Sequence, residues 1–313
     1  MIDVVRLGTY TIDYKKPPSG SPRNPRVDSN GFLWVHGDNG FYVYRTEGPD
    51  IRELVASDTT RTNCWDSIED ASGYIHMVNS TNGINAYSWD GTTLTRIVTS
   101  AYGTVGVCTD GTYIYGNAGG MLNKLSWDGA TYTCVAYKAT YMNANIIHLG
   151  GYLWGATSNE DYGVAMQNVN MTSSTRYSAQ TKYDPETVCT DGTYVYTDNM
   201  YPEVDSIWKF HRSGTNIVCD GSGGVHVNTR GICWDSSRSW VLASGQLSLQ
   251  VNGYDTSLTQ QATSLARDYI NNNRGIYAGN GYIYDTSGGV SVWGYGDAGW
   301  QGSNRAQTIW TTP

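Results

Sequence analysis

The chain has 313 residues and a formal net charge of −8, and only 15% of its residues are charged. This acidic balance, without a run of lysines and arginines, excludes a nucleic-acid partner, because binding of nucleic acid depends on neutralising phosphates. No segment approaches the roughly 20 consecutive apolar residues that cross a bilayer, so membrane insertion is excluded too. The N-terminus has no apolar segment of secretory length, and we expect synthesis in the cytoplasm without a signal peptide.

A phrase of alternating aromatic and aliphatic residues, in most copies preceded by a turn glycine, recurs along the chain. Its seven copies begin at Asn30, Ser72, Asp110, Gly150, Asp191, Ser239 and Asn280. The spacing of about 42 residues is typical of a four-stranded propeller blade. The sequence therefore predicts an all-β fold, a seven-bladed β-propeller of four-stranded antiparallel blades, in a single domain over residues 1–313.

Each unit is expected to contain an inner strand, a tight turn, a second strand and an outer hairpin. In the third unit the inner strand is predicted over 104–108 and the second strand over 113–115. Four aspartates occupy equivalent positions in the first turns: Asp28, Asp70, Asp110 and Asp191. We interpret them as turn residues that bind local backbone donors, rather than as a ring of cation ligands.

The two ends of the chain are expected to meet. The strand over 4–10 has no partner in the first unit, and we predict that it is the outer strand that closes the last blade and removes an exposed sheet edge. Residues 294–313 are left over as a C-terminal tail. Two alternatives stay open for it: pairing with the last blade through 306–310, or docking on a partner.

Cysteines and histidines give no sign of a metal centre. Cys108, Cys189 and Cys233 each precede a first turn, which places them on inner strands, and we predict buried thiols there rather than disulfides or metal ligands. The five histidines lack the spacing that brings two ligands to one strand face. We therefore predict no metal, no cofactor and no catalytic residue.

Residues 26–35 and 188–196 resemble the strand–turn–strand phrase of NHL-like and quinoprotein-like repeat propellers. The resemblance extends in weaker, repeated form over most of the chain. It implies a seven-bladed ring and transfers no active site.

Loops after the second strands are the predicted binding surface, because in a propeller they gather on one face around the channel. Their amide, carboxylate and aromatic groups suit hydrogen bonding to sugar hydroxyls or to a protein backbone. The alternative is that these loops are polar only because they are solvated. The candidate ligand-binding residues are His36, Asp38, Asn39, Asn79, Asn117, Asn159, Asp161, Asp198, Asn199, Tyr201 and Asp285.

The first functional hypothesis is a non-enzymatic binding or assembly propeller, a virion structural or receptor-binding component of the phage tail or neck type. The alternative is a carbohydrate-binding lectin with sites in the blade loops, and the third hypothesis is an enzyme that acts on polysaccharide. The expected partners are other proteins of an assembly or glycans, with homo-oligomers allowed. The expected location is the virion, with secretion by a route not visible in the sequence as the alternative.

Overall fold

The structure is a computed structural model, and it describes the residues in twelve segments. These are 2–10, 23–47, 50–103, 105–159, 162–177, 185–199, 207–224, 229–245, 251–264, 275–279, 282–285 and 290–295. Every regular element in these segments is a β-strand, and none of them contains a helix that could cross a membrane.

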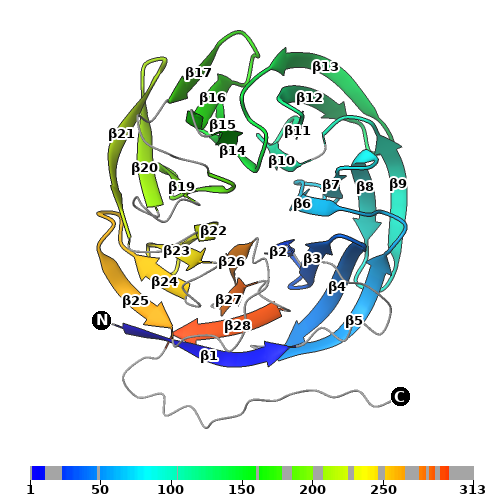
Figure 1. The fold of residues 1–313 in the computed structure, drawn as a ribbon. Helices are drawn as coiled ribbons and strands as arrows, with labels where there is room; N and C mark the ends of the chain where they lie inside the picture. Colours follow the sequence, from blue (N-terminus) through cyan, green and yellow to red (C-terminus); the bar gives the residue numbers. More distant parts are fainter. Residues whose placement is uncertain are drawn as a thin grey trace.

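Five four-stranded antiparallel sheets follow one another around a ring, each with its first strand nearest the centre (Figure 1). The first two sheets are β2 (Arg23–Val27), β3 (Leu33–Gly37), β4 (Gly40–Glu47), β5 (Asp50–Asp58), and β6 (Cys64–Glu69), β7 (Ile75–Asn79), β8 (Gly83–Trp89), β9 (Leu94–Ser100). The third and fourth are β10 (Gly106–Thr109), β11 (Ile114–Ala118), β12 (Met121–Trp127), β13 (Tyr132–Ala139), and β14 (Ile146–Leu149), β15 (Tyr152–Asn159), β16 (Tyr162–Asn168), β17 (Ser174–Tyr177). The fifth is β18 (Val188–Thr190), β19 (Val195–Asp198), β20 (Ile207–Ser213), β21 (Asn216–Gly223).

A sixth sheet has eight strands and contains both ends of the described chain. Its members are β22 (Thr229–Asp235), β23 (Trp240–Gly245), β24 (Val251–Tyr254), β25 (Gln260–Ser264), β26 (Ile276–Gly279), β27 (Tyr282–Asp285), β28 (Val290–Tyr295) and β1 (Ile2–Tyr10). The N-terminal strand β1 pairs antiparallel with β28 and parallel with β25, so it joins β22–β25 to β26–β28.

The prediction of a propeller built from four-stranded antiparallel units is confirmed, but the predicted seven blades do not appear as seven sheets. The described strands form six sheets, because β1 is hydrogen-bonded on both sides. The predicted second-strand phrases all fall on strands. The tail pairing predicted through 306–310 lies outside the described residues.

The first-turn aspartates have the structural role expected of them. Asp110 Oδ1 accepts the backbone N–H groups of Thr112 and Tyr113 at 2.8 and 2.7 Å, and Oδ2 accepts the Tyr115 hydroxyl at 2.7 Å. The following Gly111 has a φ of +89°, a left-handed conformation that glycine adopts without strain. The same pattern holds Asp191 to Tyr196, Asp28 to Trp34, and Asp70 to His76.

The apolar core lies between neighbouring sheets. Between the first two sheets, Trp34 and Phe41 pack with Met77 and Tyr87, all almost fully buried. The predicted inner-strand thiols Cys108, Cys189 and Cys233 are buried on β10, β18 and β22, and all six cysteines are free. Packing between sheets therefore fixes the inner strands that surround the axis.

Candidate functional site

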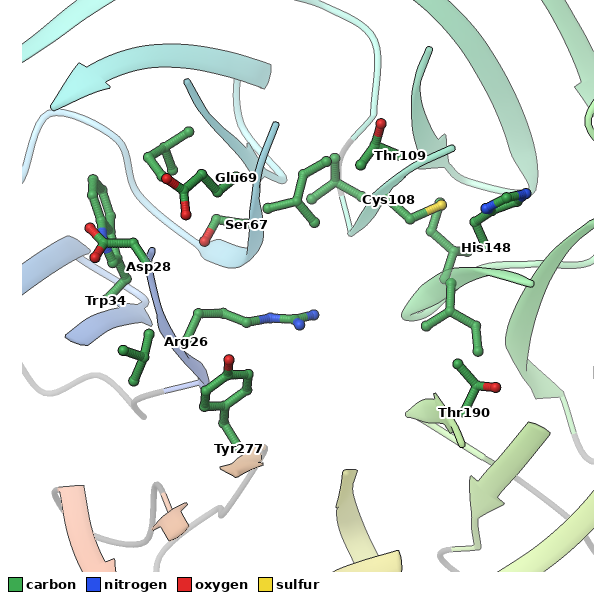
Figure 2. Close-up of a pocket in the computed structure, with 16 residues that line it drawn as sticks. Arg26, Asp28, Trp34, Ser67, Glu69, Cys108, Thr109, His148, Thr190 and Tyr277 are labelled. Atoms are coloured by element: carbon green, nitrogen blue, oxygen red, sulfur yellow. The ribbon is translucent and has the colours of Figure 1, made fainter. Parts of the chain in front are cut away.

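A cavity of about 370 Å³ lies at the carboxyl ends of the inner strands, and we call it the channel chamber (Figure 2). Its wall is made of apolar and polar side chains in about equal number. The polar and charged side chains around it are Arg26, Asp28, Ser67, Glu69, Thr109, His148, Thr190 and Tyr277. A second cavity of about 260 Å³ lies at the amino ends of the inner strands and shares Arg26, Ile147, Thr190 and Tyr277 with the first.

Arg26, near the end of β2, extends its guanidinium into the channel chamber (Figure 2). Its Nε and Nη2 atoms lie 3.4 and 3.3 Å from one oxygen, Asp66 Oδ1, and its Cζ lies 5.9 Å from the Tyr277 ring centroid. The side chain is 36% exposed. A guanidinium has five N–H donors, so this single long contact leaves donors facing the cavity.

Asp66 is fully buried and holds Arg26 from one side. Asp66 Oδ1 also accepts the Ser67 N–H at 2.9 Å, and Oδ2 accepts Asn145 Nδ2 at 2.8 Å. Burial raises the pKa of Asp66, against the opposing effect of the Arg26 charge. Burial acts to lower the pKa of Arg26, but the charge and hydrogen bond of Asp66, together with Tyr277 and Cys233, outweigh it and the pKa is raised, so Arg26 remains a cation. Asn145 and Arg26 thus link three sheets through one carboxylate.

Two further carboxylates, Asp28 and Glu69, lie together at one side of the chamber (Figure 2). Glu69 accepts the Ser29 N–H at 2.7 Å and the Ser29 hydroxyl at 2.6 Å. Burial raises the pKa of Asp28, and the charge of Glu69 adds to this effect. Within the described residues neither carboxylate has an ion-pair partner.

Two threonine hydroxyls and the Cys108 thiol in the chamber are not activated as nucleophiles. The hydroxyls of Thr109 and Thr190 donate to backbone carbonyls of their own turns at 2.9 and 2.7 Å. Burial and the nearby charges of Asp66 and Asp110 raise the pKa of the Cys108 thiol, which therefore stays protonated at neutral pH.

A further cavity of about 380 Å³ lies outside the channel, beside Trp154, Tyr194 and His211. His211 Nδ1 is 2.7 Å from Asp220 Oδ2, and Arg212 donates to the Gly214 carbonyl at 2.7 Å. Its charged groups therefore have partners within their own hairpin, unlike the cavity-facing donors of Arg26.

The residues predicted from the loops after the second strands do not gather into a pocket. His36 and Asn79 are fully buried, and burial lowers the pKa of His36 to about 4, so its imidazole is neutral. His36 Nδ1 lies 2.7 Å from the Asn24 carbonyl oxygen. Asn79 Oδ1 accepts the backbone N–H groups of Thr81 and Asn82, its own turn.

Asn117 and Asp198 occupy equivalent places in the third and fifth sheets and are also fully buried. Asn117 accepts the Gly106 N–H and donates to the Ala144 carbonyl, both at 2.6 Å, which ties its sheet to the start of the next. Asp198 accepts the Glu186 N–H, the Thr187 N–H and the Thr187 hydroxyl, all at 2.8 Å. These side chains face buried backbone groups rather than a loop surface, which corrects their predicted exposure.

The remaining predicted residues are scattered. Asp38 forms an ion pair with the almost buried Arg23, Asn39 is half-buried and Asn199 is buried. Asn159 and Asp285 end strands whose backbone alone is described there, and Asp161 and Tyr201 lie outside the described residues. None of the described candidates lines the channel cavities, and their role in binding stays a prediction.

Sequence reasoning missed Arg26, Asp66 and Tyr277. A signal for Arg26 was present, because an arginine on an inner strand points either into a sheet interface or toward the axis. No pattern in the sequence singled out Asp66. The pairing of these two residues depends on sheets that are 40 residues apart in sequence.

Comparison with solved structures identifies the same architecture in other proteins. A streptogramin B lyase has a TM-score of 0.68 at 15% identity, over 94% of this chain and 96% of that one. A virginiamycin B lyase from Staphylococcus aureus also has a TM-score of 0.68, at 11% identity, over 94% and 99%. The extracellular domain of a hybrid two-component system from B. thetaiotaomicron has a TM-score of 0.65 at 14% identity, over 93% of this chain and 40% of that one. No protein-family model and no curated protein matches the chain.

These similarities establish a β-propeller fold and overturn the first functional hypothesis. The virion prediction is wrong: the similar structures are two lyases and an extracellular domain, and nothing in them supports a phage role or carbohydrate binding. The flat prediction of a non-enzyme is also too strong, because the lyases are enzymes on the same type of fold. Partners, oligomeric state and location stay predictions. The chain is shown to be a β-propeller that resembles both enzymes and an extracellular domain.

Proposed function

We propose that this propeller binds a small molecule in the channel chamber, through a group that accepts hydrogen bonds from Arg26. The proposal depends on one observation: a permanently charged guanidinium faces a cavity of about 370 Å³ while only one oxygen of Asp66 contacts it. A carboxylate or a carbonyl oxygen matches such a donor, because the planar fork of arginine suits planar acceptors.

The size and lining of the chamber support this proposal. Ligand pockets typically have about 300–1,000 Å³ and mostly apolar walls with a few placed polar groups. Here Ile68, Val107 and Ile147 supply apolar surface, and Tyr277 supplies an aromatic ring beside Arg26. The chamber therefore offers burial for a small ligand together with one directional anchor.

We propose binding rather than turnover as the primary role. The threonine hydroxyls are committed to their turns and the Cys108 thiol is held protonated, so neither is a ready nucleophile. The similarity to lyases supports a fold that can host catalysis, and a chemical change in a bound ligand would extend the proposal rather than replace it.

The test is a ligand screen with a matched pair of variants. Small carboxylates and amides are titrated against the wild type, and binding is followed by protein-observed NMR. Arg26→Lys keeps the charge but loses the fork, so a chamber ligand should bind about ten-fold more weakly, the loss of roughly one charge-assisted hydrogen bond. Arg45→Lys, on the exposed side of β4, should bind like the wild type. Equal affinity of wild type and Arg26→Lys for every hit would contradict the proposal.

We also propose that the eight-stranded sheet is two blades, so that the ring has seven and β1 closes the last one. The pairing of β1 with β28 spans six residue pairs, whereas its parallel contact with β25 spans three. Removal of residues 1–10 should then lower the unfolding midpoint in urea by exposing the edge of β28. An unchanged midpoint would contradict this closure.

A further inference from the structure

The formal charges around the channel chamber do not balance. Arg26 is compensated by Asp66, which leaves the carboxylates of Asp28 and Glu69 without an ion-pair partner among the described residues. An anionic ligand held by Arg26 would therefore meet two negative groups in the same cavity. Repulsion between like charges in a partly desolvated site disfavours that arrangement.

Comparison between repeats shows that the two carboxylates differ in their structural roles. Asp28 has the same turn role as Asp110 and Asp191, so its carboxylate is explained by local structure. Glu69 stands one residue before its turn aspartate, where the third and fifth units have Thr109 and Thr190. Those threonines bond to their own turns, whereas Glu69 reaches across to Ser29 in the neighbouring sheet.

The contact with Ser29 places the Glu69 carboxylate beside Asp28 and holds it there. Ser29 donates both its N–H and its hydroxyl to the Glu69 carboxylate, at 2.7 and 2.6 Å, and each carboxylate oxygen keeps a free lone pair. Asp28 is held equally firmly by the N–H groups of Asn30 and Phe32 and by the Trp34 indole. Two preorganised carboxylates thus lie at one edge of the chamber, and Arg26 extends into the chamber from β2 (Figure 2).

We infer that the ligand carries a cationic group, such as an amine, which binds between Asp28 and Glu69 while an acceptor group of the same ligand binds Arg26. This inference depends on the proposed function and names its ligand class: a small zwitterion or another molecule with a basic nitrogen beside a carboxylate or carbonyl. The cation removes the repulsion between the two carboxylates and forms charge-assisted hydrogen bonds with both.

The experiment compares probes that differ only in charge. β-Alanine, γ-aminobutyrate and ε-aminocaproate are each titrated beside the alkanoate and the alkylamine of the same chain length, with protein-observed NMR as the readout. The best zwitterion should bind about ten-fold or more tightly than its alkanoate, the effect of one charge-assisted hydrogen bond. An alkanoate that binds as tightly as its zwitterion would overturn the inference.

Variants of Glu69 test whether this residue causes the preference for a zwitterion over an alkanoate. Glu69→Gln should abolish the advantage of the zwitterion over the alkanoate, and Glu69→Thr, which copies Thr109, should do the same if the amide substitution disturbs folding. Glu53→Gln makes the same charge change on the exposed outer strand β5 and should keep the full preference. A zwitterion preference that survives both Glu69 variants would contradict the inference.

The outcomes also separate this inference from the proposed function. If alkanoates bind more weakly to Arg26→Lys than to the wild type, and zwitterions bind no more tightly than alkanoates, the chamber proposal stands and the inference of a cationic group is contradicted. Zwitterions that bind equally to wild type and Arg26→Lys would overturn the chamber proposal. Failure of every probe to bind would count against both.

Discussion

The two ends of the inner strands use similar polar side chains in opposite ways. At the amino ends, Asn117 and Asp198 are completely buried, and their side-chain oxygens receive backbone donors at 2.6–2.8 Å. At the carboxyl ends, Arg26 is one-third exposed and makes only long contacts with a single oxygen. A polar group whose hydrogen bonds are all made within the protein stabilises the ring, whereas one with free donors next to a cavity is available to a ligand.

The comparison shows that residue type alone does not distinguish a site from a structural support. The asparagines and aspartates after the second strands suggested a binding surface, yet Asn79, Asn117 and Asp198 are hydrogen-bonded to backbone groups of nearby strands and turns. The arginine in the channel was not among the residues predicted from the sequence, yet several of its N–H donors are free to bind a ligand. Mutations at each end should therefore affect different properties, stability at one and binding at the other.

The largest expected effect is the loss of stability in Asn117→Ala. This change leaves the Gly106 N–H and the Ala144 carbonyl buried without partners, and each unsatisfied group costs about 1–3 kcal/mol. The free energy of unfolding in urea should fall by about 3 kcal/mol, an estimate from the same penalty. A decrease of less than about 1 kcal/mol would mean that water replaces the hydrogen bonds of the Asn117 amide. That result would contradict the claim that the polar groups at the amino ends are fully hydrogen-bonded within the protein.

A smaller loss is expected at the other end from Arg26→Met. The change removes the cation from the fully buried Asp66, and breaking such a pair costs about 3–5 kcal/mol when both partners are buried. Because Arg26 is partly exposed, about 2 kcal/mol is expected here. The double variant Arg26→Met with Asp66→Asn should regain most of that loss in the same urea experiment while remaining unable to bind chamber ligands. Equal stabilities of the single and double variants would contradict a charge-based cause.

A pH-dependent effect is expected from Asp198. Burial raises the pKa of Asp198 to about 7 in the folded protein, against an ordinary value of 3.8. Between these values the folded state keeps a proton that the unfolded chain releases, so this group contributes stability at low pH that is lost as the pH rises toward 7. Asp198→Asn does not titrate, and its stability relative to wild type should increase by at least about 1 kcal/mol across that window, since each pKa unit is worth about 1.4 kcal/mol.

Urea unfolding at several pH values measures this difference directly. Asp220→Asn is the matched control, because Asp220 is exposed and pairs with His211 outside the channel. A constant difference between Asp198→Asn and wild type from acid to neutral pH would show that Asp198 does not hold the proton. Asn117 shows that an asparagine is accommodated at the equivalent position of another sheet.

The smallest stability effect should come from Glu69→Gln. A glutamine carbonyl can still accept a hydrogen bond from Ser29, and Glu69 is only half-buried, so unfolding in urea should change by less than about 0.5 kcal/mol. The variant therefore separates binding from folding. A loss above about 2 kcal/mol would place Glu69 with the structural residues of the opposite end.

Much of the fold was predictable because the same turn and strand residues recur in each unit and act through local contacts. The turn aspartates, their glycines with positive φ and the alternating second strands appear in the sequence at a fixed interval, and the buried thiols followed from their position before a turn. The joining of two units by β1 was not predictable, because parallel pairing with β25 leaves no periodic signal.

The chamber itself was not predictable from spacing. Arg26, Asp66 and Asn145 come from three different sheets, and only the closed ring brings them into contact. The exposure of Arg26 and the burial of Asn117 depend on packing across the axis, which the pattern within one repeat does not contain.

Cys108 permits the most direct test of the central claim, that a ligand of this protein occupies the channel chamber. Its thiol lines the chamber, whereas Cys134 lies on the outer strand β13 and provides an internal control. The rates at which methylmercury modifies both thiols are measured by mass spectrometry, with and without the best ligand from the screen. We predict that saturating ligand slows modification of Cys108 several-fold and leaves Cys134 unchanged; equal Cys108 rates with and without bound ligand would contradict the account.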